Sequence, residues 1–93
     1  MSYRIKYTNT FKKDLARCEK WGYDMDLARN TISMLAENGK LPENYQPHKL
    51  TGKYKGGCWE CHLKPDWLLV WKQDDDNLIL LFTNTGTHSD LFG

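Results

Sequence analysis

The chain has 93 residues, which suits one compact domain, 1–93, with a radius of gyration of about 12 Å. A chain this short buries only about 60% of its unfolded surface, so we expect a shallow groove and not an internal substrate chamber. With 40% hydrophobic and 27% charged residues, the composition excludes a disordered tail. The longest apolar runs, residues 67–71 and 78–82, are too short to span a bilayer, and the first residues have no apolar signal region. We therefore expect a cytoplasmic protein without a membrane partner.

The net charge of +1 conceals two halves of opposite sign. Residues 1–55 contain eleven Lys and Arg against six Asp and Glu, which is +5, and residues 56–93 contain two against six, which is −4. Basic residues concentrate in the stretch from Tyr45 to Lys55, which has no carboxylate. This stretch is a candidate phosphate-binding region, although a solvated loop rich in lysine has the same composition.

The first elements predicted along the chain are a short strand and a helix. Residues 3–7 alternate as in a strand, with Ile5 directed inward. Asn9 or Thr10 is expected to cap the helix, and Gly22 is a natural stop after it. Its apolar positions recur at helical spacing and are Phe11, Leu15, Cys18 and either Trp21 or Gly22.

A second helix is expected to follow at once, so that the two helices form a hairpin. Asp24 is placed to cap it and Gly39 to end it. Its apolar stripe consists of Ala28, Ile32, Leu35 and Ala36. Residues 40–47 contain two prolines and no period, which predicts an extended connector.

The second half of the chain has the pattern of β-structure. Strands are predicted at residues 57–63, 67–72 and 78–85, separated by turns at residues 64–66 and 74–77. The order is therefore β-α-α-β-β-β, typical of the α+β class, with a helical hairpin packed against one antiparallel-rich sheet.

The cysteines do not predict a disulfide framework or a metal site. Three cysteines without an export signal are expected to stay reduced, and Cys18 fits the apolar face of the first helix. The run from Cys58 to His62 matches the C-x-x-C-H pattern of haem attachment, but it leads into β-structure. Residues 58 and 61 of a strand point to opposite faces, which is poor chelating geometry. No metal and no cofactor is expected.

Period-two geometry divides the strand at residues 57–63 into two faces. Trp59, Cys61 and Leu63 are expected to face the helices. Cys58, Glu60 and His62 are expected on the opposite, open face. Trp67 and Trp71 are also expected to pack in the core. The cationic residues of the first helix are expected to point outward, as a solvated face or a nucleic-acid contact. Those cationic residues are Lys12, Lys13, Arg17 and Lys20.

Three histidines and two carboxylates form the candidate chemical group. His48, His62 and His88 each lie beside a turn or on an open strand face, where packing does not require them. Imidazoles with a free pKa near 6.5 exchange protons at neutral pH, and Glu60 or Asp66 can orient them. RNA cleavage without a metal needs a base for the 2′-hydroxyl, an acid for the 5′-oxygen and a cation for the phosphorane. The residue types present match those needs.

Three segments of the sequence resemble the YafQ branch of the RelE/ParE toxin superfamily. They read HKLTGKYKG at residues 48–56, HLKPDWLLV at 62–70 and TGTHSDLFG at 85–93. The similarity covers nearly the whole chain. It implies a small bacterial toxin with the RelE-like microbial ribonuclease fold that cuts messenger RNA in the ribosomal A site.

The resemblance also implies roles for particular residues. Carried over, the catalytic group is His48, His62, Asp66 and His88, with Glu60 in the place of an acidic residue. We expect His48 or His62 to act as base, His88 as acid and Asp66 as the orienting carboxylate. The residues implied to contact RNA are the terminal aromatic Phe92, Asn84, which stands where relatives often have arginine, and the compensating cations Lys49, Lys53 and Lys55.

The family implies partners as well as an activity. These are the ribosome with its RNA, messenger RNA, and a cognate antitoxin, expected to be a ribbon-helix-helix dimer that connects the toxin to operator DNA only indirectly. Two alternatives stay open: a ParE-like toxin that binds DNA gyrase without catalysis, and a catalytically weak RNA-binding module. The histidine and carboxylate group favours the nuclease, because a pure inhibitor does not need it.

Overall fold

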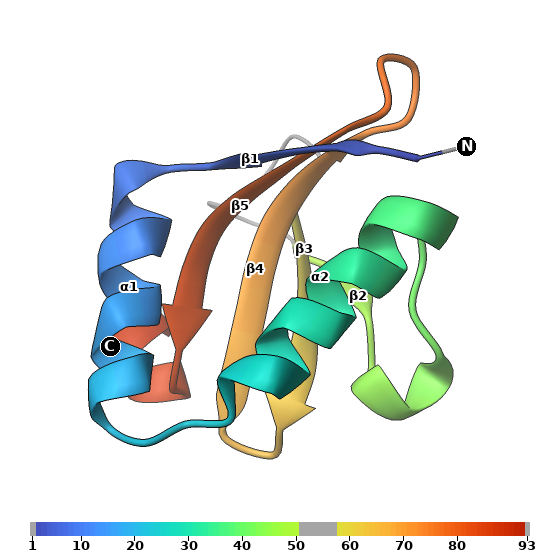
Figure 1. Cartoon of the computed structure of the whole chain (residues 1–93). Helices are drawn as coiled ribbons and strands as arrows, with labels where there is room; N and C mark the ends of the chain where they lie inside the picture. The colour runs from blue at the N-terminus through green and yellow to red at the C-terminus, as the bar shows by residue number, and fades with distance from the viewer. Residues whose placement is uncertain (1, 51–57, 93) are drawn as a thin grey trace.

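The computed structural model describes residues 2–50 and 58–92 as a five-stranded sheet with helices (Figure 1). The strands are β1 (Arg4–Tyr7), β2 (His48–Lys49), β3 (Cys58–Lys64), β4 (Trp67–Asp74) and β5 (Ile79–Gly86). The strand order is β1-β5-β4-β3-β2; β1 pairs with β5 in parallel and the other pairs are antiparallel. Helices α1 (Asn9–Lys20) and α2 (Met25–Asn38) pack on one face of the sheet. The α+β architecture with a helical hairpin is confirmed, and the radius of gyration is 12.3 Å.

Side-chain caps explain where the two long helices begin. The cap of α1 is Thr8 and not the predicted Asn9 or Thr10, because the Thr8 hydroxyl accepts a hydrogen bond of 3.0 Å from the backbone N–H of Phe11. The predicted cap of α2 is confirmed: the Asp24 carboxylate accepts from the Leu27 backbone N–H at 3.2 Å.

Glycine ends α2 where the sequence predicted it. Gly39 is left-handed, with φ of 70°, and its N–H donates to the carbonyl of Leu35 at 2.8 Å. A side chain there would also meet the ring of Tyr3, because an added Cβ would lie 2.7 Å from that ring.

The connector between α2 and β3 contains structure that the prediction missed. A 3-10 turn, η1 (Glu43–Tyr45), interrupts the expected extended segment, and Gln46 after it is left-handed with φ of 51°. His48 and Lys49 then form β2, paired with Glu60 and Trp59 of β3. A strand of two residues is too short to show a period, so only the structure reveals it.

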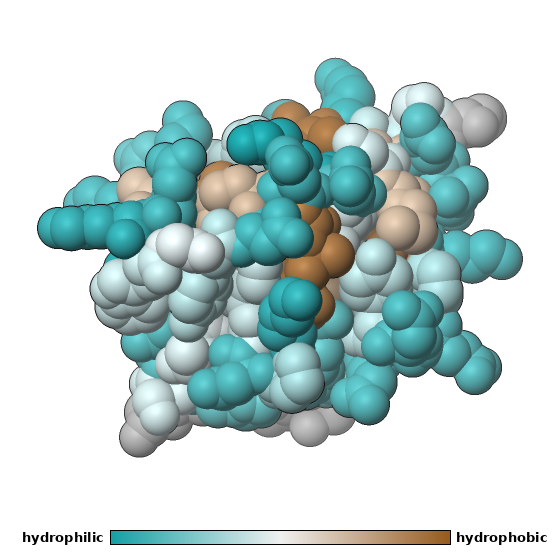
Figure 2. Space-filling model, turned by 60° about the horizontal axis from the view of Figure 1, so that its bottom comes forward, coloured by the Kyte–Doolittle hydropathy of each residue, from teal (hydrophilic) through white to brown (hydrophobic). Residues whose placement is uncertain are grey.

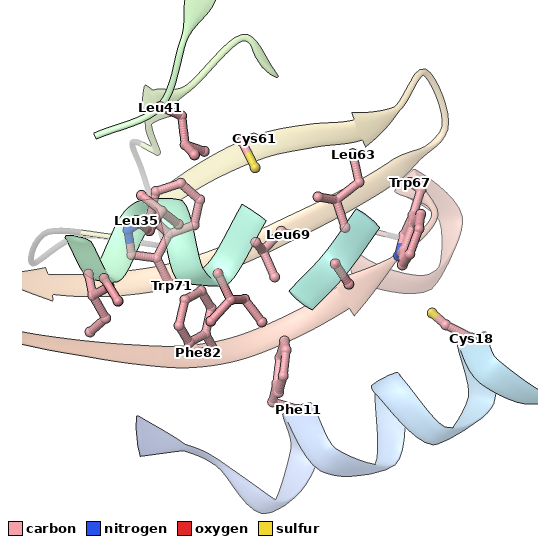
Figure 3. Close-up of a cluster of buried hydrophobic side chains, with 14 residues drawn as sticks. Phe11, Cys18, Leu35, Leu41, Cys61, Leu63, Trp67, Leu69, Trp71 and Phe82 are labelled. Carbon is pink, nitrogen blue, oxygen red and sulfur yellow. The ribbon is translucent and has the colours of Figure 1, made fainter. Parts of the chain in front are cut away.

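Aromatic and aliphatic side chains fill the space between the sheet and the two helices. Figure 3 shows Phe11 of α1 directed at Phe82 of β5, and their ring centres lie 5.6 Å apart. Trp71 of β4 is 1% exposed and packs against Phe82. The prediction that Trp59, Cys61 and Leu63 face the helices is confirmed, since all three belong to this core or pack against it.

Two predicted core positions lie outside the core. All four residues of β1 are exposed, Ile5 included, because β1 is an edge strand with few neighbours. Trp21 follows the end of α1 and is 53% exposed. Figure 2 shows a further strip of hydrophobic side chains that stays exposed among hydrophilic ones. A groove between α1 and α2 is lined by Leu15, Ala28 and Ile32.

Candidate active site

A row of paired residues crosses four strands on the face of the sheet that points away from α1 and α2. His48 pairs with Glu60, Glu60 with Val70, and Val70 with Asn84. Directly paired residues of neighbouring strands present their side chains to the same face. The row therefore places His48, Glu60 and Asn84 on one face, with Val70 between Glu60 and Asn84.

Glu60 is the centre of the site and is buried, which corrects the prediction of an open face. Its side chain is 6% exposed, and its Oε1 atom lies 3.8 Å from Nε2 of His48 and 3.9 Å from Nε2 of His62. His48 is half-exposed and His62 is 22% exposed. A carboxylate between two accessible imidazoles can stabilise a proton on either ring, as general acid–base catalysis requires.

The backbone before β2 sets the direction of the His48 ring. Nδ1 of His48 lies 3.0 Å from the carbonyl oxygen of Gln46, and the ring donates a hydrogen bond to that oxygen when Nδ1 carries the proton. Nε2 then faces Glu60. The left-handed φ of Gln46 is unusual for a residue with a side chain, and it lies directly beside the site.

The second half of the site joins the β3–β4 turn to the C-terminal helix α3 (His88–Phe92). Oδ1 of Asp66 lies 3.5 Å from Nδ1 of His88 and accepts from the His88 backbone N–H at 3.4 Å. The rings of His62 and His88 are neighbours, with centres 5.9 Å apart and planes tilted by 50° to each other. The five residues expected to be catalytic thus form one continuous group, in the order His48, Glu60, His62, His88 and Asp66.

Hydrogen bonds at the start of α3 hold His88 in place. Thr87 and Asp90 cap the helix reciprocally: the Thr87 N–H donates to Oδ2 of Asp90 at 2.9 Å, and the Asp90 N–H donates to the Thr87 hydroxyl at 3.1 Å. The Thr87 N–H, its hydroxyl and nearby Arg17 hold the pKa of Asp90 below its ordinary value. The carboxylate form of Asp90 is therefore the one that supports the helix.

The structure separates the residues that were expected to contact RNA. Asn84 lies on the face of the site. Lys49 does not, because it pairs with Trp59 and its Nζ atom lies 5.6 Å from the centre of the Trp59 ring, towards the helices. Lys53, Lys55 and the side chain of Phe92 lie outside the described residues, so their expected roles stay predictions.

A shallow groove beside His62 contains residues that the sequence did not point to. It is lined by Asn44 and Gln46 from the connector and by Lys64 and Pro65 from the end of β3 and the following turn. Lys64 is exposed and brings a cation to the groove that contains His62. The only feature of the sequence that could have indicated Lys64 is its position two residues after His62.

The three cysteines lie in the interior of the protein. Cys18, Cys58 and Cys61 are all buried thiols, and burial raises the pKa of Cys61 to about 12. Within residues 2–50 and 58–92, no three His, Cys, Asp or Glu side chains are arranged to hold a metal ion. The same part of the chain has no helix that is long and apolar enough to cross a membrane.

Comparisons with known proteins agree with this fold. The mRNA interferase toxin YafQ of Escherichia coli (strain K12) is 37% identical over 90 residues, which cover 96% of this chain and 95% of the relative. The crystal structure of the E. coli DinJ-YafQ toxin-antitoxin complex matches all of this chain and all of that chain with a TM-score of 0.90 and 35% identity.

A metal-bound toxin from Helicobacter pylori matches 99% of this chain and 100% of that chain, with a TM-score of 0.87 and 37% identity. The family model of YafQ, a bacterial toxin of type II toxin-antitoxin systems, matches residues 3–93. These findings confirm the resemblance found in the sequence motifs: the chain belongs to the YafQ family of toxins of type II toxin-antitoxin systems.

Proposed function

We propose that this protein is an endoribonuclease that cleaves messenger RNA in the ribosomal A site by general acid–base catalysis without a metal ion. The observation that carries the proposal is the continuous group of three histidines and two carboxylates on one side of the sheet. The E. coli relative is named an mRNA interferase, which supports the substrate class.

The reaction begins with removal of a proton from the 2′-hydroxyl of the nucleotide before the cleaved bond. His48 or His62 takes that proton, and Glu60 stabilises the imidazolium that forms, because its carboxylate lies within 4 Å of both rings. The 2′-oxygen forms a bond to the phosphorus, and the bond to the 5′-oxygen breaks. The products are a 2′,3′-cyclic phosphate and a 5′-hydroxyl.

His88 donates the proton that the departing 5′-oxygen needs. The Asp66 carboxylate accepts a hydrogen bond from the His88 backbone N–H and lies beside Nδ1 of the His88 ring, which orients that ring next to His62. Because the rings of His62 and His88 are neighbours but are not stacked, one can take the proton of the 2′-hydroxyl while the other gives a proton to the 5′-oxygen of the same phosphodiester. Among the residues that the structure describes, Lys64 and the side-chain amide of Asn84 can contact the phosphate. Lys53 and Lys55 are expected to add positive charge there.

The proposed partners follow from the same function. We expect a cognate antitoxin of the ribbon-helix-helix type whose acidic tail complements the +5 half of the chain. The DinJ-YafQ complex shows that a relative binds an antitoxin. The ribosome supplies the substrate, and operator DNA is reached only through the antitoxin.

Primer extension on a defined message tests the proposal. Purified protein is incubated with programmed ribosomes or with naked message, with and without 1,10-phenanthroline, which chelates transition metals and leaves the Mg²⁺ that ribosomes need. The variants H62Q and H88A are compared with the control R29Q, which changes an exposed residue of α2. We expect cuts at in-frame positions that need ribosomes, persist in phenanthroline and in R29Q, and fall about 10²- to 10⁴-fold in the histidine variants.

Two other results would overturn parts of the proposal. Loss of the cuts in phenanthroline would show that a transition metal takes part in the reaction. An uncut message in cells whose growth the wild-type protein arrests would favour the ParE-like gyrase inhibitor or the RNA-binding module.

A further inference from the structure

Arg17 joins three elements that meet at the end of α1. Its Nη1 atom donates to Oδ1 of Asp14 at 3.2 Å, and its Nη2 atom donates to the carbonyl of Thr85 at 3.2 Å. Nη2 also lies 3.6 Å from Oδ2 of Asp90 in α3. The sequence predicted that Arg17 points outward, but its side chain is only 34% exposed, because it reaches back over the end of β5. Figure 1 shows α3 beside the second half of α1.

Asp14 completes this joint from the same helix. Its carboxylate is 11% exposed, and Oδ2 accepts a hydrogen bond of 3.2 Å from the Thr85 backbone N–H. The N–H and the carbonyl of Thr85 are therefore bound by Asp14 and Arg17 respectively. The two residues fix the backbone three positions before His88.

Gly86 leaves the space through which Arg17 reaches Asp90. A Cβ atom at residue 86 would lie 2.8 Å from Nη2 of Arg17 and 2.9 Å from Oδ2 of Asp90. Any side chain there would push the guanidinium and the carboxylate apart. The close approach therefore depends on glycine at this position.

Helix α3 needs this support because it has only five residues. A helix shorter than about 12 residues is not stable by itself in water, and α3 depends on its cap and on contacts with its neighbours. Asp90 provides both, since the same Oδ2 atom accepts from Thr87 and faces Arg17. The position of His88 at the start of α3 follows from where Asp90 is held.

We propose that Arg17 is a positioning residue for the nuclease reaction, which holds α3 through Asp90 and Thr85 so that the His88 ring stays beside Asp66 and His62. This inference rests on the proposed function. Arg17 does not contact the phosphate in this proposal, because two carboxylates and a carbonyl already face its guanidinium. It acts through His88, which makes the chemical contact.

The test measures catalysis and the His88 ring separately. R17Q removes the charge and the fork of donors, and R17K keeps the charge but can reach fewer partners. The control is R29Q, the same change at an exposed arginine of α2. Cleavage of ribosome-bound message gives kcat and KM. The ¹H–¹³C NMR signals of the histidine rings report the surroundings of His88 without any need for activity.

We expect kcat of R17Q to fall about 10²-fold with KM unchanged, because a small displacement of an acid costs rate and not substrate binding. R17K is expected to recover part of that loss. The His88 ring signal should shift and broaden in R17Q while that of His48 stays in place, and R29Q should match the wild type in every measurement.

Other outcomes would overturn the inference. A rise in KM with kcat unchanged, stronger at high salt, would identify Arg17 as a phosphate contact. An unmoved His88 signal in folded R17Q would refute positioning. If R17Q does not fold, the variant D90N breaks the same ion pair from the side of α3. Its amide oxygen can still accept the hydrogen bond from the Thr87 N–H. An unmoved His88 signal in D90N would refute the inference equally. If the wild type cuts no message, the nuclease proposal fails, and the NMR signals still decide whether Arg17 holds His88.

Discussion

The hydroxyl of Thr85 offers a sharp test of how the end of β5 is stabilised. Thr85 is fully buried, and its hydroxyl donates to the carbonyl of Leu68 at 2.7 Å and accepts from Nε1 of Trp67 at 2.9 Å. The substitution T85V keeps the shape of the side chain and removes both bonds. It leaves the indole N–H of Trp67, which is 3% exposed, without its acceptor.

The expected cost follows from the two lost bonds. A buried donor left unpaired costs about 1–3 kcal/mol, and the lost bond to the Leu68 carbonyl adds about 1 kcal/mol. We therefore expect T85V to lower the free energy of unfolding by about 2–4 kcal/mol. For a domain of this size, that corresponds to a fall in Tm of about 10–20 °C.

Thr31 provides the matched control. It is also fully buried, but its hydroxyl donates at 2.8 Å to the carbonyl of Leu27, four residues earlier in α2. That carbonyl keeps its helical hydrogen bond from the Thr31 N–H when the hydroxyl is removed. T31V should therefore cost less than about 1 kcal/mol.

Urea unfolding followed by far-ultraviolet circular dichroism measures both variants without relying on the fluorescence of Trp67. The reasoning is refuted if T85V and T31V lose the same stability within about 0.5 kcal/mol. That result would mean that the Trp67 indole finds another acceptor or that the bond contributes nothing net.

The remaining predictions concern protonation and backbone geometry. Hydrogen bonds from Thr87 hold the pKa of Asp90 below its ordinary value. Asp90 therefore stabilises the fold at pH values above its unfolded pKa, and this contribution is lost as the pH falls through the folded pKa. The free energy of unfolding of D90N should then vary less with pH in acid than that of the wild type. Burial raises the pKa of Cys61 to about 12, so iodoacetamide at pH 8 should modify this thiol in urea and spare it in the native protein, and rapid native labelling would contradict the burial. G39A forces a side chain into a left-handed position against Tyr3, so thermal unfolding should show a loss of at least about 1 kcal/mol, whereas no loss would mean that the Tyr3 ring moves aside freely.

The sequence was sufficient for most of the fold because its signals are local. Asp24 and Gly39 mark the ends of α2 through cap chemistry that depends on a few neighbouring residues. Alternation in β3 correctly assigned Cys61 to the core. Ile5 was assigned wrongly because alternation shows which residues share a face, and not whether an edge strand is covered.

The sequence predicted which residues form the candidate site, but not how deeply they are buried or which distant residues hold them. Residue type and turn position brought out His48, His62 and His88, and the structure places them in one group. The burial of Glu60 was missed, because it depends on neighbouring strands and not on its own segment. Arg17 was missed for the same reason, since its partners lie about seventy residues away in β5 and α3.

The pairing of β1 with β5 has a consequence for how the protein becomes active as it folds. The register joins residue 4 to residue 79, so closing the sheet requires contact between regions far apart in the chain. Glu60 and His62 lie on the local β3–β4 hairpin, and β5 pairs with β4 in the next hairpin. His88, however, lies on α3, which is tied to Arg17 of α1 through Asp90, and α1 follows β1 in the chain. A partly folded chain can thus form the hairpins before α3 is held in place, and nuclease activity should appear only when β1 and α1 pack against β5, later than the hairpins.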